Sequence, residues 1–249
     1  MSIHIRSTLR QAWKLVYGAK KAYFFGLVGL ILIQTVLLCV SEELNKHFAN
    51  ALWIGPLMTI IMLFCTSPVA AGFAMLGLKQ AQHQPFKWNA AFAYFKRIFP
   101  LFSVYFISSL VLWFSALVIL FALLKLSMLI IGPYDWTGHD ARLRLTVFVG
   151  VSIVTVLLCV AIYTFFNFSF LFILEAKQRF YQAIWSSIRL SWAHFKGIYG
   201  LTLLLFILNC IGTLCFGVGL LWTLPLTYIS MALVYRKFAH PASIHTDVN

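Results

Sequence analysis

The stretch EAKQRFYQAIWSSIRLSWAHFK, residues 175–196, lies between two long apolar runs and carries a helical pattern of its own. Its apolar residues recur at three- and four-residue steps, which places them on one face of a predicted helix: Tyr181, Ile184, Trp185, Ile188, Trp192 and Phe195. A second face holds Gln182, Ser186, Arg189, Ala193 and Lys196. A helix with an aromatic face and a basic face is typical of the boundary between acyl chains and headgroups. The stretch therefore predicts an interfacial helix between membrane spans.

The composition of the whole chain is that of an integral membrane protein. Of 249 residues, 62% are hydrophobic and 10% are charged, and the mean hydropathy is +0.91, whereas a soluble domain has about a quarter of its residues charged. Lys and Arg outnumber Asp and Glu by 19 to 6, but no basic run with interleaved polar residues indicates a nucleic-acid partner. The first apolar run follows Lys21 and is long enough to span, so a retained anchor is expected rather than a cleaved signal peptide.

Stretches without Asp, Glu, Lys or Arg predict the number of spans. They are residues 22–41, 47–78, 98–124, 145–174 and 197–235. A spanning helix needs about 20 apolar residues, so each of the first four supplies one helix. The last is about twice as long, and Gly217-Val218-Gly219 near its middle favours a tight turn between helices at about 198–216 and 220–238. The sequence thus predicts six transmembrane helices.

The distribution of basic residues predicts the orientation of these helices. With a cytoplasmic N-terminus, the inner segments are 1–21, 78–99, 175–197 and 236–249, and they hold 15 of the 19 Lys and Arg residues. The outer segments hold Lys46, Lys125, Arg142 and Arg144, together with four of the six acids, Glu42, Glu43, Asp135 and Asp140. Basic residues concentrate on the cytoplasmic side of membrane proteins. Both termini are therefore expected to be cytoplasmic.

Sequence similarities within the chain predict three repeated units in a single transmembrane domain, residues 1–249. The sequence FKRIF at 95–99 matches FKGIY at 195–199, and KKAY at 20–23 is a fainter third copy. Pro68, Phe166 and Pro225 are each followed eleven residues later by a basic residue. The units are approximately 1–80, 85–177 and 178–238, with a polar tail at 239–249. The predicted fold is an all-α polytopic bundle of three hairpins, each preceded by a short amphipathic interfacial helix.

The basic and aromatic residues of the third unit are candidates for contact with lipid headgroups. They are Lys177, Arg179, Trp185, Arg189, Trp192 and Lys196. Each cation near an anionic membrane surface contributes about 1 kcal/mol. The alternative is that these residues anchor the helix and determine topology without binding a specific lipid. Membrane lipids, anionic ones included, are the expected partners, with a membrane-protein partner or a second copy of the chain also open.

A second set of residues is a candidate for a transport path: Pro68, Asn167, Asn209 and Pro225. Prolines in membrane helices can mark broken helices along a path, but they are also tolerated as packing kinks. Amides within the membrane, Gln34 included, more often join helices by hydrogen bonds than bind a solute. The apolar runs hold no ionisable residue at mid-depth, so transport coupled to a charged relay is not expected.

The chain has no motif for catalysis, a cofactor or a metal. The five cysteines form no CxxC or Cys/His cluster, so we expect them to pack as small apolar residues. Asp135, His139 and Asp140 gather in the largest outer loop, where neighbouring aromatic residues favour an interfacial anchor over a metal site. Gly72, Gly77 and Gly212 permit close helix approach, although no clean GxxxG pair occurs. A non-enzymatic protein is expected.

The residues SSIRLSWAHFK at 186–196 resemble the signature of the YciC-like bacterial inner-membrane proteins. The sequence GVGL at 217–220, followed by Pro225-Leu226 and Tyr235-Arg236, is similar to related membrane families and to the membrane domain of some glycerophosphodiester phosphodiesterases. The resemblance covers roughly residues 164–238 and implies a six-helix protein of the bacterial cytoplasmic membrane. It implies no activity, because the chain has no soluble phosphodiesterase domain. An envelope scaffold or lipid-interacting module is the expected function, with a transporter for a small or amphiphilic solute as the alternative and a lipid-active enzyme third.

Overall fold

The structure is a computed structural model that describes residues 4–48, 53–86, 88–131, 141–214 and 217–239. Every element in these ranges is helical. The order is α1 (Ile5–His47), α2 (Ile54–Ala81), the 3₁₀ helix η1 (Trp88–Arg97), α3 (Ile98–Ile131), α4 (Ala141–Thr164), α5 (Ser169–Leu174), α6 (Phe180–Ala193), α7 (Phe195–Leu214) and α8 (Leu220–Ala239). Asp135, His139 and Asp140 of the predicted outer loop, Cys215 and most of the polar tail lie outside the described residues.

Five of the described helical segments are long and apolar enough to cross a membrane, judged by length and composition. They are Ile5–His47, Ile54–Ala81, Ala91–Leu126, Leu145–Leu174 and Phe195–Leu214. These helices identify the chain as a membrane protein. Helix α8, the sixth predicted span, is not among the five, because its 20 residues include polar and basic positions. The six-span count therefore stays a prediction.

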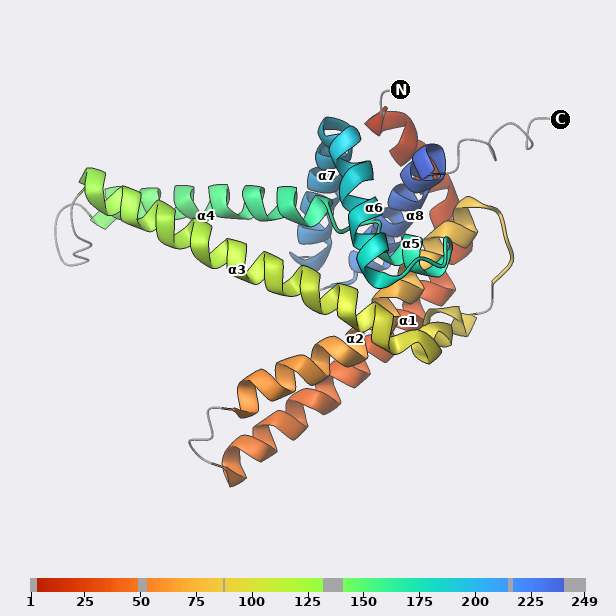
Figure 1. Ribbon diagram of the computed structural model, residues 1–249, viewed down its shortest axis with the longest axis horizontal. Coiled ribbons are helices and arrows are strands. Elements are labelled where there is room, and N and C mark those ends of the chain that lie inside the picture. Colours follow the sequence, from red (N-terminus) through yellow and green to blue (C-terminus); the bar gives the residue numbers. More distant parts are fainter. Residues whose placement is uncertain (1–3, 49–52, 87, 132–140, 215–216, 240–249) are drawn as a thin grey trace.

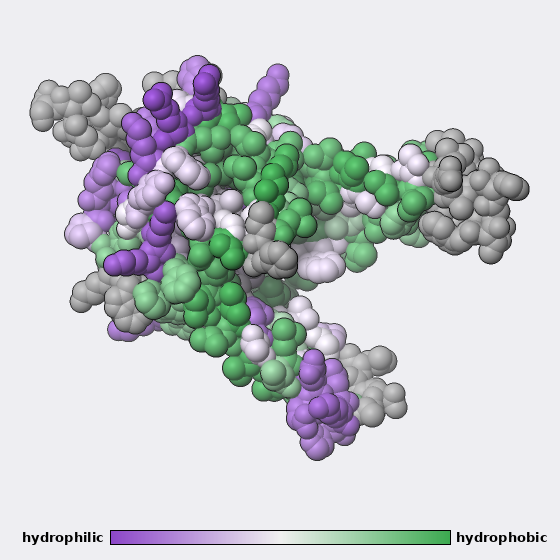
Figure 2. All heavy atoms as spheres, turned by 180° about the vertical axis from the view of Figure 1, so that it is seen from behind, coloured by the Kyte–Doolittle hydropathy of each residue, from purple (hydrophilic) through white to green (hydrophobic). Residues whose placement is uncertain are grey.

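Two pairs of helices form long arms that diverge from a common base (Figure 1). Helices α1 and α2 pair along one arm, and α3 and α4 pair along the other. The shorter helices α5 to α8 lie at the base (Figure 1). Helix α8 packs on α1 and α2 and α5 packs on α2, whereas α6 packs on α3 and α5. Figure 2 shows apolar side chains over both arms, with hydrophilic ones gathered at the base and at the end of the α1–α2 arm. The arms thus present the kind of surface that acyl chains cover.

The core lies at the base rather than along the arms. Buried positions at three- and four-residue steps, Ala12, Val16, Ala19 and Tyr23, form the inward face of α1 and pack on α2 and α8. The Tyr23 hydroxyl donates to the carbonyl of Phe73 at 2.9 Å, which connects α1 to α2 inside this core. In the outer parts of both arms, by contrast, large apolar side chains such as those of α3 are exposed.

The amphipathic segment before the first hairpin is not a separate helix, although a separate interfacial helix was predicted before each of the three hairpins. Helix α1 runs from Ile5 to His47 without interruption. No proline occurs between Arg6 and Lys21, and Gly18 is helical, so nothing in this stretch ends the backbone hydrogen-bond ladder. The segment before the second hairpin is the 3₁₀ helix η1, which continues directly into α3. The segment before the third hairpin is the separate helix α6.

The long apolar run at residues 145–174 is interrupted, although one continuous helix was predicted there. Helix α4 ends at Thr164, residues 165–168 form turns, and α5 begins at Ser169. The amide of Phe165 donates to the carbonyl of Ile162 at 3.1 Å, and that of Phe166 to Tyr163 at 3.0 Å. These bonds tighten the end of α4 and leave later carbonyls without a partner in their own helix.

The last apolar run divides into two helices as predicted. Helix α7 ends at Leu214 and α8 begins at Leu220. Gly217 has a φ of 75°, which favours glycine, and its carbonyl accepts from the amide of Leu220 at 3.0 Å. The turn returns the chain so that α8 packs against α7.

Candidate functional site

Helix α6 packs against the interruption after α4 by a stripe of small residues. Ala183, Ser187 and Ser191, four positions apart, are fully buried. The Ser187 hydroxyl donates to the carbonyl of Phe165 at 2.6 Å and accepts from the amide of Phe168 at 3.2 Å. The Ser191 hydroxyl donates to the carbonyl of Thr164 at 2.9 Å. The two serines therefore satisfy the backbone groups that the interruption leaves free.

The other faces of α6 lie outward. Lys177, Arg179, Arg189 and Lys196 are all exposed. Trp185 and Trp192 are 68% and 71% exposed, which is more than a folded core would leave uncovered. All six headgroup candidates therefore lie on the surface along one short stretch of chain, which we call the α6 surface.

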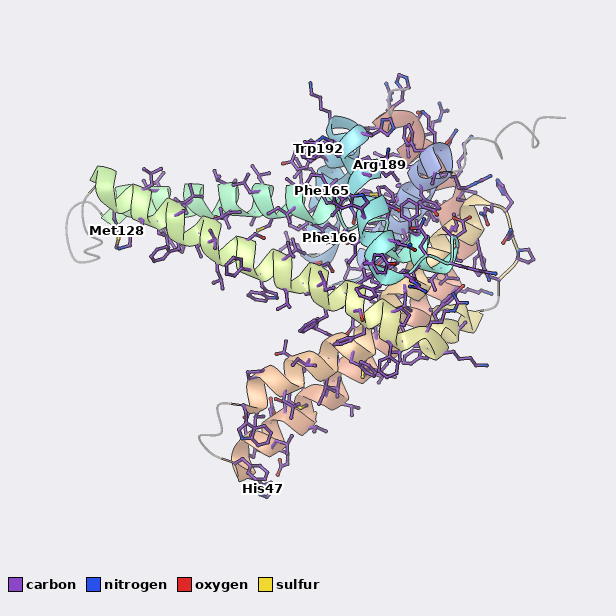
Figure 3. The ribbon with its side chains drawn as sticks, in the orientation of Figure 1. His47, Met128, Phe165, Phe166, Arg189 and Trp192 are labelled. Carbon is purple, nitrogen blue, oxygen red and sulfur yellow. The ribbon has the colours of Figure 1, made fainter. Side chains whose placement is uncertain are left out.

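Aromatic stacking holds part of the α6 surface in place. The ring of Trp192 stacks on Phe165, with 5.9 Å between centroids, and Phe165 also stacks on Phe195 at 5.6 Å. Figure 3 shows Trp192 and Arg189 on α6, with Phe165 below Trp192. The interruption after α4 and the α6 surface thus form one structural unit.

The four cations of the α6 surface form no ion pair with a carboxylate in the described part of the chain. Glu43, at the far end of α1, forms salt bridges with Lys46 at 3.1 Å and with His47 at 3.6 Å. Unpaired cations beside exposed tryptophans attract anionic groups at a membrane surface.

One residue near the α6 surface was missed by the sequence reasoning. Glu175, between α5 and α6, accepts from the side-chain amide of Gln82 at 3.1 Å and interacts with the hydroxyl of Tyr235. The next residue, Arg236, donates to the carbonyl of Ala81 at the end of α2. These contacts connect the ends of α2, α5 and α8. Glu175 is the one acid in the predicted inner segment 175–197, and this was the available signal in the sequence.

A cavity of about 550 Å³ lies among α3, α4, α7 and α8. Asn167 and Asn209, two of the four candidates for a transport path, both line it. A smaller cavity of about 290 Å³, which also reaches α2, shares these two amides and the side chain of Tyr163. The sequence pattern identified both amides as candidates. It did not predict that they line the same cavity, since they are 42 residues apart in the chain.

Both amides also join helices, as the alternative interpretation expected. Asn167 Nδ2 donates to the hydroxyl of Thr202 at 3.2 Å, and Asn209 Nδ2 donates to that of Thr227 at 2.9 Å. Gln34 forms the same kind of bond, from α1 to Thr66 on α2, at 2.6 Å. The amides therefore have a structural role that does not depend on a solute.

The two prolines proposed for the transport path do not line this cavity. Pro68 and Pro225 are buried inside continuous helices, α2 and α8, and neither lines either cavity described above. Pro68 removes the donor that the carbonyl of Phe64 would otherwise have. The Ser67 hydroxyl donates to that carbonyl at 3.1 Å, so the loss is compensated locally. This geometry is that of a packing position.

The described residues include no group of three or more His, Cys, Asp or Glu side chains that could hold a metal ion. Comparisons with family models, curated proteins and solved structures find no match to this chain. The resemblance to YciC-like proteins therefore stays a prediction from the residues quoted for it.

Proposed function

We propose that this protein is a non-enzymatic, lipid-interacting module of the bacterial cytoplasmic membrane. In this proposal it spans the bilayer six times, as three hairpins with both termini cytoplasmic, and α8 supplies the sixth span. The α6 surface then lies at the inner leaflet and binds anionic lipid headgroups. A scaffold role within the envelope is compatible with this binding, and the apolar arms offer area to a membrane-protein partner or a second copy of the chain.

The observation that carries the proposal is the exposure of four unpaired cations beside Trp185 and Trp192 on one short stretch. A surface that served only to pack α6 would need the stripe of small residues and nothing more. Tryptophan rings lie at headgroup level, where the charges of Arg and Lys meet lipid phosphates. The predicted inner segments hold 15 basic residues, including the four of the α6 surface, which supports a position of this surface on the cytoplasmic side.

The double substitution Arg189→Gln and Lys196→Gln should weaken binding of an anionic lipid. Loss of about 1 kcal/mol per cation corresponds to roughly 30-fold weaker binding. Phosphatidylglycerol and phosphatidylcholine are titrated into the detergent-purified protein, and the thermal unfolding midpoint is followed. Phosphatidylglycerol should raise the midpoint of the wild-type protein at concentrations about 30-fold lower than those that the variant needs.

The matched control removes two positive charges from the predicted outer side. Lys46→Gln with Lys125→Gln changes the net charge equally but leaves the α6 surface intact. Its phosphatidylglycerol titration should equal that of the wild-type protein. Equal weakening in both double variants would show that net charge, not the α6 surface, attracts the lipid.

Transport of a small or amphiphilic solute is the second candidate function. The cavity of about 550 Å³ lined by Asn167 and Asn209 favours it, because polar groups facing a space between helices are a feature of transport sites. Pro68 and Pro225 do not favour it, because both are buried outside the cavity and Pro68 is compensated locally by Ser67. We therefore rank transport below lipid interaction.

A further inference from the structure

We infer that the cavity among α3, α4, α7 and α8 binds a neutral amphiphile that carries a hydroxyl or amide group on an apolar body. Its volume of about 550 Å³ lies within the range of small-molecule sites. This site is separate from the α6 surface, and the inference requires neither headgroup binding nor transport.

The charge of the ligand follows from the cavity wall. No Asp, Glu, Lys, Arg or His is among the residues that line the cavity, which are chiefly apolar: Leu112, Trp113, Val160, Leu205, Phe206 and Met231 represent them. A charged group in such surroundings would lose its hydration without gaining a partner of opposite charge. The part of the ligand inside the cavity is therefore neutral and mostly apolar.

The donor group of the ligand follows from the orientation of Asn167. The hydroxyl of Thr202 donates to the carbonyl of Ile198 at 2.9 Å, so its oxygen accepts from Asn167 and selects the Nδ2 side of the amide. The Oδ1 atom of Asn167 then lies on the side of the amide away from Thr202, where a ligand donor can approach it. A ligand hydroxyl or amide N–H would supply that donor.

Asn209 is oriented in the same way. Thr227 donates to the carbonyl of Thr223 at 2.7 Å and accepts from Asn209 Nδ2. The Oδ1 atom of Asn209 is buried and has no donor among the described residues. Buried acceptors are almost always paired in folded proteins, so an acceptor without a donor in a cavity wall favours a donor-bearing ligand.

The acceptor group of the ligand follows from three tyrosines. Tyr163 lines both cavities, and Tyr105 and Tyr228 line the smaller one. The hydroxyls of Tyr105, Tyr163 and Tyr228 lie near enough to interact electrostatically with one another, and a tyrosine hydroxyl can donate to a ligand oxygen. A hydroxyl or amide group satisfies both sides of this wall, since it both donates and accepts.

A pair of matched probes tests the inference on the wild-type protein in phosphatidylcholine nanodiscs. The probes are 11-bromoundecan-1-ol and its methyl ether, which differ in the hydroxyl donor. Trp113 lines the cavity and is 71% exposed, so bromine bound there should quench its fluorescence. Saturable quenching by the alcohol should occur at about fivefold lower concentration than by the ether, the advantage of about one hydrogen bond.

Variants assign the effect to the cavity. Trp113→Phe should abolish the saturable quenching. Asn167→Leu should raise the alcohol concentration needed for quenching to that of the ether. Thr202→Val should do the same if Asn167→Leu lowers the yield of folded protein. Gln34→Leu removes an equivalent amide–threonine bond between α1 and α2 and should change neither probe. Equal quenching by both probes in the wild-type protein, or saturable quenching that persists in Trp113→Phe, would overturn the inference.

Discussion

Gly77→Ala should destabilise the fold by about 1–3 kcal/mol, because it forces two helix backbones apart. A Cβ atom at this position would lie 2.6 Å from the carbonyl oxygen of Tyr228 on α8. The obstacle is backbone, not the mobile end of a side chain, so it cannot move without shifting α8 as a whole. Unfolding by sodium dodecyl sulfate in mixed micelles, followed by tryptophan fluorescence, measures the difference.

Gly150→Ala is the matched control for this prediction. Nothing lies within 4 Å of a Cβ atom at Gly150, which is on the exposed part of α4. Alanine is favoured over glycine inside a helix by about 0.5–1 kcal/mol, so this variant should be as stable as the wild-type protein or slightly more stable. Equal destabilisation by both substitutions would contradict the close packing of α2 on α8.

The double substitution Ser187→Ala and Ser191→Ala should destabilise the protein by roughly 3 kcal/mol, about 1 kcal/mol for each buried backbone group left without a partner. Those groups are the carbonyls of Thr164 and Phe165 and the amide of Phe168. Removal of the two hydroxyls leaves these three backbone groups buried against apolar side chains without a hydrogen-bond partner. The same detergent unfolding measures the loss.

Ser186→Ala is the control for the two serines, since it changes a neighbouring hydroxyl on another face. Ser186 donates to the side chain of Gln178, which is near the surface. Its replacement should change stability by less than about 0.5 kcal/mol. A double variant as stable as the wild-type protein would show that α6 does not hold the interruption after α4.

Features that depend on local pattern were predictable from the sequence. The long apolar runs predicted membrane helices, and Gly217 predicted the turn before α8, because composition and glycine conformation act within a few residues. The exposure of Trp185 and Trp192 also agrees with the predicted aromatic face.

Features that depend on distant partners were not predictable in the same way. Residues 165–168 contain no glycine or proline, and the interruption there is stabilised by serines about 20 residues later. The stripe of Ala183, Ser187 and Ser191 combines one small apolar residue with two serines, so its hydrophobicity does not mark it as a buried face. The cavity required α4 and α7 to be placed against α3, which no spacing along the chain reveals.

Native mass spectrometry of the protein, released from a mild detergent after extraction from a bacterial membrane, shows whether the α6 surface holds anionic lipid. We expect a mass increase corresponding to an anionic phospholipid on the wild-type protein, and its loss from the variant with Arg189→Gln and Lys196→Gln. A wild-type protein without bound lipid, or one that retains zwitterionic lipid as well as anionic lipid and does so equally in the variant, would contradict this expectation.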